Sequence, residues 1–416
     1  MKKRVYAALM AGIMLFGTVG CTSGGNGGNG GNGGNDGGAS NGGAAGNGTK
    51  IGAILVGDEN EGYTYAHIEG IKKAAADAGI AAENIIWKYS VPEDESCETA
   101  AKDLVDQGCS AIFSNSYGHQ SFMQQVASEY PDVSFVSMTG DTAASSGLEN
   151  FSNAFTKIYE SRYVSGVVAG MKVAELAAQN KLSAENYDAN GNVLIGYVGA
   201  YPYAEVVSGY TAFFLGVQRV YQNVSMEVTY TNSWFDITAE GEAANALMAD
   251  GCVIIGQHAD STGAPTAVQA ALDSGKVAYS VGYNVDMLSV APDAALTSAT
   301  NNWSVYYKHA FDQVLAGSKI DTNWAEGYSQ GAVAITKLGP SVAEGTADKV
   351  AEVEAAIKDG SLHVFDTSKF TVDGANLSSF VLDDGYEAIS DGYFHESEHV
   401  SAPYFSLRID GIKELN

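Results

Sequence analysis

Short apolar runs alternate with helical stretches along most of this chain, and this alternation restricts the fold more than any other feature. The run at 50–57 (KIGAILVG) ends in glycine, and the next stretch places Ile68, Ile71 and Ala75 on one helical face. Such alternation predicts a parallel sheet with helices on both faces. Strands are expected at 50–57, 85–89, 111–114 and 133–138, with helices at 65–78 and 98–107.

The same order of segments recurs in the second half of the chain. The segment 106–115 (DQGCSAIFSN) aligns with 249–258 (ADGCVIIGQH), which matches Cys109 with Cys252 and Asn115 with His258. The sequence therefore predicts an α/β protein with two similar lobes. Strands are expected at 193–199, 227–230, 252–256 and 277–282, and helices at 209–221 and 238–249.

Two doubly wound, Rossmann-like lobes are expected to face each other across a cleft. Ligands of open α/β sheets bind beyond the carboxyl ends of the strands, so the cleft is the expected site. A two-lobe protein that closes about a hinge has the architecture of type I periplasmic binding proteins. We expect residues 49–160 and part of 300–338 in lobe 1, and 161–300 in lobe 2. Residues 339–416 are expected to form an extension that packs near the hinge.

The first 48 residues have a different character. Basic residues at 2–4 and an apolar stretch that ends at Gly20 are typical of a bacterial signal peptide over 1–20. Cys21 follows directly and resembles the lipidated cysteine of bacterial lipoproteins, although Thr18 stands where that motif usually has leucine. The alternative is an ordinary signal peptide with an incidental cysteine. Residues 21–48 are then the lipidated cysteine and a flexible Gly/Asn-rich linker. We expect a lipid-anchored protein on the extracytoplasmic face of the cell membrane.

Charge and motif content exclude several functions. The net charge of −27 becomes −30 when the three basic residues of the expected signal peptide are removed, and such an acidic surface repels nucleic acid. The sequence has no G-x-S-x-G, H-E-x-x-H or P-loop motif and no Cys/His spacing typical of zinc, so we expect no enzyme, cofactor or metal. Cys97, Cys109 and Cys252 are interpreted as small buried residues without a disulfide.

The residues that follow the expected strands are rich in aromatic, amide and acidic side chains. Aromatic faces stack on planar rings, and amides and carboxylates match the edge of a heterocycle or a sugar hydroxyl. Lys and Arg are nearly absent from these loops, which argues against a phosphate or carboxylate ligand. The alternative is that some aromatics belong to the core or the lobe interface and that His258 is structural. The candidate ligand-binding residues are Asp58, Tyr63, Tyr65, Asn115, Trp234, His258, Asp260, Gly282, Asn284, Asp286 and Asn301.

Several short stretches carry a family resemblance. They are 61–67 (EGYTYAH), 158–162 (IYESR) with Gly166, 232–236 (NSWFD), 257–260 (QHAD), 281–286 (VGYNVD) and 296–298 (LTS). Over about 50–338 the sequence resembles the basic membrane protein (BMP) family of substrate-binding lipoproteins, which serve ABC importers and typically bind purine nucleosides. The GYTYAH and NSWFD versions resemble a branch associated with purine bases.

The resemblance implies roles for individual residues. Tyr63 and Trp234, one from each lobe, match the aromatics that sandwich the purine, with Trp234 expected after the second-lobe strand that corresponds to the first strand of lobe 1. Asn115 matches the family's polar residue after the third strand, and the ribose-binding residues lie near Asp58, Gly282 and Asn284. Nucleoside-binding members carry a lysine where this chain has Asn301, so recognition of a ribose stays open.

The expected function is therefore capture of a purine base or nucleoside for an ABC permease in the membrane. A receptor for a sugar or signal molecule is an alternative within the same architecture, although sugar sites usually include Arg. A surface adhesin or structural lipoprotein without transport is an alternative from another class.

Overall fold

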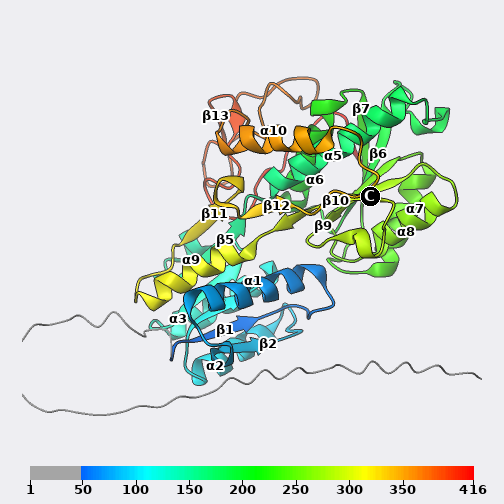
Figure 1. Cartoon of the computed structure of the whole chain (residues 1–416). Coiled ribbons are helices and arrows are strands. Elements are labelled where there is room, and N and C mark those ends of the chain that lie inside the picture. The colour runs from blue at the N-terminus through cyan, green and yellow to red at the C-terminus, as the bar shows by residue number, and fades with distance from the viewer. Residues whose placement is uncertain (1–47) are drawn as a thin grey trace, which may run out of the picture. The chain divides into compact units, whose positions relative to one another are not determined.

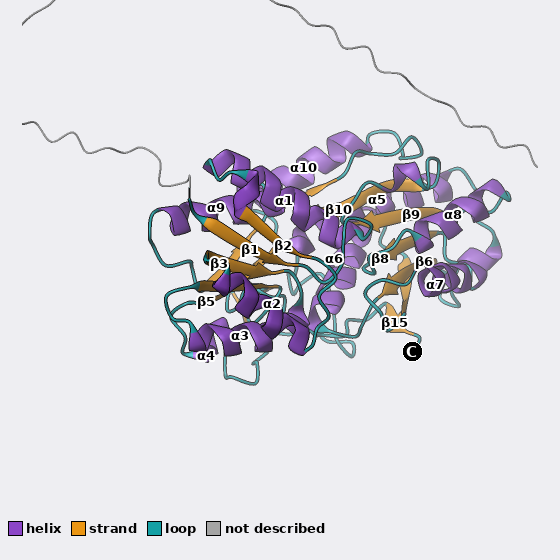
Figure 2. Cartoon of the chain, turned by 90° about the horizontal axis from the view of Figure 1, so that it is seen from below, coloured by secondary structure: helices purple, strands orange, loops and turns teal. Residues whose placement is uncertain are grey.

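Lobe 1 is built on a six-stranded sheet in which all pairings are parallel. The computed structural model describes residues 48–416 (Figure 1). Helices α1 (Gly62–Ala78) and α9 (Trp303–Leu315) cover one face of this sheet, and α2 (Glu95–Asp106) and α3 (Gln120–Glu129) cover the other (Figure 2). Across the sheet the strands are β11 (Asn323–Glu326), β5 (Phe151–Thr156), β4 (Ser134–Met138), β3 (Cys109–Ser114), β1 (Lys50–Ile54) and β2 (Ile85–Lys88).

Lobe 2 has a seven-stranded sheet in which only the edge strand β12 runs antiparallel. Across this sheet the strands are β12 (Val333–Ile335), β10 (Ala295–Asn301), β9 (Tyr279–Tyr283), β8 (Ile254–Gln257), β6 (Val193–Gly199), β7 (Val224–Tyr230) and β15 (Ile412–Glu414). Its helices are α5 (Ile158–Ala178), α6 (Ala204–Val220), α7 (Ile237–Ala249) and α8 (Gly263–Asp273).

Local sequence explains where several elements begin and cross. The Asp236 carboxylate accepts the N–H groups of Thr238 and Ala239 and so caps the start of α7. Helices α5 and α6 cross closely at Gly166, which has no side chain. A Cβ there would lie 2.1 Å from the Phe213 carbonyl oxygen, so the close approach requires glycine.

The two lobes share one strand order, which confirms the predicted α/β fold with two doubly wound lobes. The order β2-β1-β3-β4-β5 in lobe 1 corresponds to β7-β6-β8-β9-β10 in lobe 2. Asn115 and His258 occupy equivalent places: the Asn115 N–H donates to the Ile54 carbonyl (3.1 Å) and the His258 N–H donates to the Val198 carbonyl (2.8 Å).

One expected correspondence is wrong. Trp234 follows β7, and β7 is the counterpart of β2. The counterpart of β1 is β6, which leads into α6. The aromatic side chains Tyr63 and Trp234 therefore come from different positions of the repeated unit.

The chain passes between the lobes at three places. It crosses after β5, after β10, and between β11 and β12. The first crossing lies at Lys157, since α5 already packs on α6 and β10. The Thr156 hydroxyl donates to the Asn301 side-chain oxygen and so connects the ends of β5 and β10.

The segment from 339 onward lies largely on lobe 2. Helix α10 (Thr346–Lys358) packs on α5, and β15 joins the sheet beside β7. Strands β13 (Ile389–Ser390) and β14 (Tyr393–Phe394) form a separate hairpin. The Ser401 hydroxyl donates to the Gly140 carbonyl of lobe 1 (3.4 Å), so this segment also reaches the other lobe.

The three described cysteines are free and buried, as predicted. Burial raises the pKa of the Cys97 thiol to about 12 and that of Cys109 to about 11, so both stay protonated and unreactive at neutral pH.

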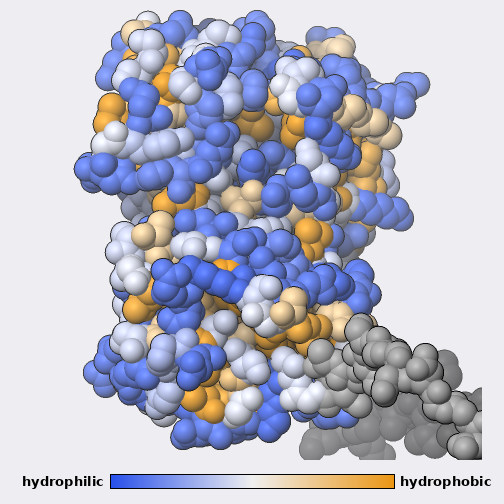
Figure 3. Space-filling model, turned by 90° about the vertical axis from the view of Figure 1, so that its left-hand side faces the viewer, coloured by the Kyte–Doolittle hydropathy of each residue, from blue (hydrophilic) through white to orange (hydrophobic). Residues whose placement is uncertain are grey.

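The face drawn in Figure 3 is mainly hydrophilic, with small scattered apolar patches. The predicted signal peptide, Cys21 and nearly all of the linker lie outside residues 48–416, which the structure describes. Among residues 48–416, no helix has both the length and the apolar character needed to cross a bilayer.

Candidate ligand-binding cleft

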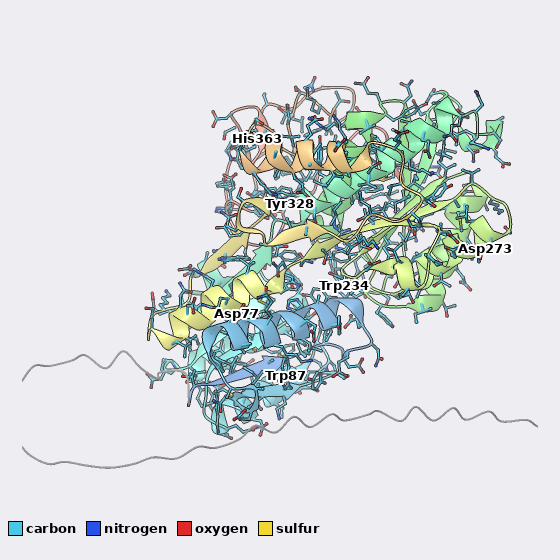
Figure 4. The ribbon with its side chains drawn as sticks, in the orientation of Figure 1. Asp77, Trp87, Trp234, Asp273, Tyr328 and His363 are labelled. Carbon is cyan, nitrogen blue, oxygen red and sulfur yellow. The ribbon has the colours of Figure 1, made fainter. Side chains whose placement is uncertain are left out.

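Strand ends and helix starts from both lobes surround one cavity, whose empty volume is about 500 Å³ when its solvent-open part is included. The Trp234 label in Figure 4 marks the point where lobe 2 approaches lobe 1. The cavity thus lies where ligands of open α/β sheets bind. Lobe 1 contributes Val56, Glu61, Tyr63, Ser116, Tyr117 and Thr139, and lobe 2 contributes Glu205, Trp234, His258, Asp260 and Tyr283.

Four of the eleven predicted residues line this cavity: Tyr63, Trp234, His258 and Asp260. Tyr65 lies at the edge of the cleft with 43% of its surface exposed, in a shallow depression that it shares with Phe235 and Asp260. The other six do not line it: five have their side chains engaged elsewhere, and the sixth is Gly282.

Trp234 is held in a half-buried position by its neighbours in lobe 2. Its ring centroid lies 5.3 Å from that of Tyr201 and 6.3 Å from that of His258. The Asp260 N–H donates to the Trp234 carbonyl (2.8 Å), which joins the loops that follow β7 and β8. The indole is therefore fixed in the cavity wall before any ligand arrives.

Tyr63 is fixed from lobe 1. Its ring packs edge-on against His67, with centroids 4.6 Å apart, and its hydroxyl donates to the Asn115 carbonyl. His67 is itself stacked on Trp303 at 4.3 Å. Tyr63 therefore presents a rigid ring to the cavity from the lobe opposite to Trp234.

Asn115 is turned into its own lobe and is almost completely buried. Its side-chain oxygen accepts the Val56 N–H (2.8 Å), and its amide donates to the Thr64 hydroxyl (3.3 Å). These contacts support the loop after β1 and the start of α1, so Asn115 positions lining residues and does not itself line the cavity.

Asn284 and Asn301 form a chain of contacts behind Asp260. Asn284, with φ of 62°, donates from its amide to an Asp260 carboxylate oxygen (2.7 Å). The Asn301 amide in turn donates to the Asn284 side-chain oxygen (3.3 Å). Both residues orient Asp260 from within lobe 2.

Gly282, Asp286 and Asp58 have local structural contacts. A Cβ on Gly282 would lie 2.5 Å from atoms of both Met287 and Ser298, so close packing excludes a side chain there. Asp286 caps the turn at Met287–Ser289 through the Leu288 N–H (2.8 Å), and Asp58 accepts the Asn60 N–H (2.9 Å).

Three carboxyl groups face the cavity: Glu61, Glu205 and Asp260. Burial, with the nearby Glu61 carboxylate, raises the pKa of Asp260 well above its usual value. Burial also raises the pKa of Glu61, whose carboxyl accepts the Thr64 hydroxyl. The absence of a side chain at Gly57 leaves room for the Glu61 carboxyl group, because a Cβ on Gly57 would lie 2.1 Å from one of the Glu61 oxygens.

His258 is neutral at physiological pH, because burial lowers its pKa to about 4. Its Nε2 lies 3.0 Å from a Glu205 oxygen, so the neutral ring donates this N–H to the carboxylate. Glu205 lies in the first turn of α6, where the helix dipole favours a negative charge.

A buried cation lies behind this wall. Arg162, on α5, donates to the Tyr197 hydroxyl (2.6 Å) and to the Gln257 carbonyl (3.0 Å). Its guanidinium carbon lies 3.9 Å from the centre of the Tyr283 ring, which separates it from the cavity. The sequence of the cleft loops could not reveal this arginine, since it comes from a helix.

Sequence reasoning also missed lining residues, among them the carboxyl groups of Glu61 and Glu205 and the phenol of Tyr283. Glu61 immediately precedes α1, which follows β1, and Glu205 lies in the first turn of α6, which follows β6. Their similar places in the two lobes were the available clue. For Thr139 only the structure provides one: its φ of 63° is strained for a β-branched residue, and such strain gathers at functional sites.

The lining combines aromatic rings from both lobes with an excess of acceptor oxygens. Such a site can stack a planar ring and accept hydrogen bonds from its edge. Residues 48–416 contain no group of three or more His, Cys, Asp or Glu side chains arranged to hold a metal ion.

Comparison with known proteins also indicates a solute-binding protein. The family model described as "ABC transporter substrate-binding protein PnrA-like" (Bmp) matches residues 49–367. A purine-binding protein of Brucella abortus (strain 2308) is 34% identical over 319 residues, which cover 76% of this chain and 83% of that protein. TsgA13 of Haloferax volcanii, provisionally named as an ABC transporter glucose-binding protein, is 34% identical over 276 residues, covering 65% of this chain and 64% of its own length.

Solved structures support the fold. A solute-binding protein of an ABC transporter system from Aeropyrum pernix K1 aligns with a TM-score of 0.61 at 15% identity, covering 76% of this chain and 93% of that one. A solute-binding protein from Conexibacter woesei aligns with a TM-score of 0.59 at 19% identity, covering 76% and 98%. These matches show the two-lobe fold of solute-binding proteins.

Proposed function

Since the chain belongs to the PnrA-like (Bmp) family of ABC transporter substrate-binding proteins, which bind solutes and are not enzymes, we propose that it captures a purine base or nucleoside between its two lobes and delivers it to an ABC permease. Substrate-binding proteins of ABC importers work outside the cytoplasm. Family membership favours this transport role over a purely structural surface protein.

One observation carries the purine proposal: Tyr63 from lobe 1 and Trp234 from lobe 2 line the same cavity. Stacking of a nucleobase on an aromatic side chain is worth about 1–3 kcal/mol, and both rings are already fixed by their neighbours. The carboxylates beside them accept hydrogen bonds from ring and amino N–H groups. The 34% identity to a protein named for purine binding supports the same ligand class.

A thermal-shift screen tests the ligand class. A ligand that binds only the folded state adds RT ln(1 + [L]/Kd) to its stability, so adenine, guanine, hypoxanthine or one of their nucleosides should raise Tm. The panel should include glucose and other hexoses, because one relative is provisionally named for glucose. A shift with a hexose and none with any purine would move the assignment to a sugar receptor.

Tryptophan fluorescence gives an independent reading of the site. A purine that stacks on Trp234 should quench its emission, and Trp234→Phe should remove that change. Trp87→Phe is the matched control, because Trp87 lies on β2 away from the cavity and stacks on Tyr89 (Figure 4). Quenching that survives Trp234→Phe would place the ligand elsewhere.

We also propose that lipid on Cys21 holds the protein at the membrane through the Gly/Asn-rich linker. Cys21→Ser should release the protein into the soluble fraction or the medium, while binding of the ligand stays unchanged because the cleft lies within residues 48–416. Unchanged membrane association of Cys21→Ser would refute the anchor and leave the ligand assignment standing.

A further inference from the structure

The hydrogen-bonding capacity of the cavity wall narrows the ligand further. Resting on the proposed function, we infer that the cleft selects purines that carry an exocyclic amino group, and that the free carboxylate oxygens of Glu61, Glu205 and Asp260 accept its N–H bonds. Adenine and guanine have this group, whereas hypoxanthine and xanthine do not.

The first step is that most hydroxyl protons of the wall are already used. Five lining residues carry a hydroxyl group. Tyr63 donates to the Asn115 carbonyl, Ser116 donates to Glu93 (2.5 Å), and Tyr117 donates to Asp141 (3.1 Å). These three hydroxyls can therefore offer a ligand only their oxygen lone pairs.

The second step concerns the carboxyl groups. In each, one oxygen has a protein donor: the Thr64 hydroxyl for Glu61, the His258 ring for Glu205 and the Asn284 amide for Asp260. The second oxygen of each group has no protein hydrogen bond within residues 48–416. When all three groups are ionised, three acceptor oxygens thus remain around the cavity. Because burial raises the pKa of Asp260 and of Glu61, this count applies at a pH above those raised values.

The third step is the small number of donors left for a ligand. His258 uses its Nε2–H on Glu205, and its other ring nitrogen is buried. Arg162 is separated from the cavity by the Tyr283 ring. Among the lining side chains, the donors without an acceptor within residues 48–416 are the Thr139 and Tyr283 hydroxyls and the Trp234 indole N–H.

The imbalance has a direct chemical consequence. An acceptor oxygen that is buried without a donor loses its hydrogen bonds to water and gains none in return. A ligand that leaves the carboxylate oxygens unpaired therefore binds poorly. An exocyclic amine supplies two N–H bonds in the plane of the ring. Hypoxanthine and xanthine have no amino group on their pyrimidine edge, so they offer the carboxylate oxygens fewer N–H bonds than adenine or guanine does.

Matched pairs of ligands test the inference on the wild-type protein by calorimetric titration. Adenine differs from purine only by its 6-amino group, and guanine differs from hypoxanthine only by its 2-amino group. The tightest base should carry an amine, and its match without the amine should bind roughly five- to a hundredfold more weakly, which corresponds to about 1–3 kcal/mol. The inference fails if hypoxanthine or xanthine binds tightest, or if loss of the amine changes Kd less than twofold.

Variants of the carboxyl groups test which residues accept hydrogen bonds from the exocyclic amino group. In Asp260→Asn and Glu61→Gln the preference for the amine should shrink, while affinity for the match without the amine should change little. A purely structural role would instead weaken both ligands equally and would contradict the inference. Glu59→Gln is the control, since Glu59 is exposed in the same loop and does not line the cavity.

Folding of each variant is checked by its Tm without ligand. The outcomes also separate this inference from the proposed function. Binding of purines without any preference for the amine overturns the inference alone, whereas absence of all purine binding overturns the proposed function.

Discussion

The two lobes share one strand order, yet they contribute differently to the cleft. Asn115 in lobe 1 and His258 in lobe 2 follow equivalent strands and make equivalent backbone hydrogen bonds. The Asn115 side chain turns into its own lobe, whereas His258 lines the cavity. Lobe 1 supplies mainly hydroxyl groups with one carboxyl group, and lobe 2 supplies two carboxyl groups, an imidazole, an indole and one phenol. A repeated backbone therefore fixes where a side chain starts, but not which way it points.

The largest expected effect on ligand binding comes from removal of the Trp234 indole in lobe 2. Trp234→Ala should weaken binding of the best purine by about 1–3 kcal/mol, or roughly five- to a hundredfold in Kd, because one stacking face is lost. Trp234 is half-buried in a loop, so the fold should persist. Calorimetric titration measures the change, and Trp87→Ala in lobe 1 should leave Kd unaltered.

The equivalent pair Asn115 and His258 sharpens the comparison. Asn115→Ala removes two buried hydrogen bonds and leaves the Val56 N–H without its partner, so stability should fall by about 1–3 kcal/mol. His258→Gln keeps an N–H donor but alters the cavity wall, so it should weaken binding more than it lowers Tm. Urea denaturation and titration of both variants give the two numbers. Equal effects of both variants on Kd would show that the lobes contribute alike.

A smaller effect is expected from pH. The raised pKa of Asp260 means that the unfolded chain releases this proton at lower pH than the folded protein does. The stability that Asp260 contributes is therefore complete at acid pH and is lost as pH rises through its folded pKa. Burial is the largest cause of the raised pKa of Asp260; the Glu61, Glu240 and Glu205 carboxyl groups raise it further, and Arg162 opposes them.

Asp260→Asn cannot titrate at this position, so without ligand it should lose less stability than the wild type between pH 5 and pH 8. His258, whose pKa burial lowers to about 4, titrates in the unfolded chain within this range, but it is present in both proteins and its contribution cancels in the comparison. Thermal melts at the two pH values provide the test. A wild-type decrease no larger than that of Asp260→Asn would show that the cleft carboxyl group is not the cause.

Much of the fold could be predicted from the sequence, because alternation of apolar runs and helical faces depends on local pattern. The alignment of Asn115 with His258 even placed two residues correctly in the repeat. The wall of the cleft was harder to predict. Asn284 follows β9 and Asn301 ends β10, but the side-chain amides of both donate within lobe 2 and not into the cavity.

Other parts of the site depend on tertiary contacts that a local pattern does not contain. Arg162 reaches the back of the wall from a helix far from the cleft loops in sequence. Tyr283 lies within a strand, where a buried aromatic is ordinarily read as core. Glu61 and Glu205 could have been found by comparing the lobes, because both lie at the N-terminal end of the first helix after the first strand of their lobe.

The central claim is that one planar ring is contacted from both lobes at once. A double-mutant cycle with Tyr63→Leu and Trp234→Leu tests it most directly, since leucine removes each ring and retains apolar bulk. Calorimetric titration with the tightest purine should show each single variant weakened by about 1–3 kcal/mol, and the double variant should depart from their sum by about 0.5 kcal/mol or more, because both rings touch one ligand. If both single variants fold normally and bind that purine as tightly as the wild type, the ring does not lie between Tyr63 and Trp234.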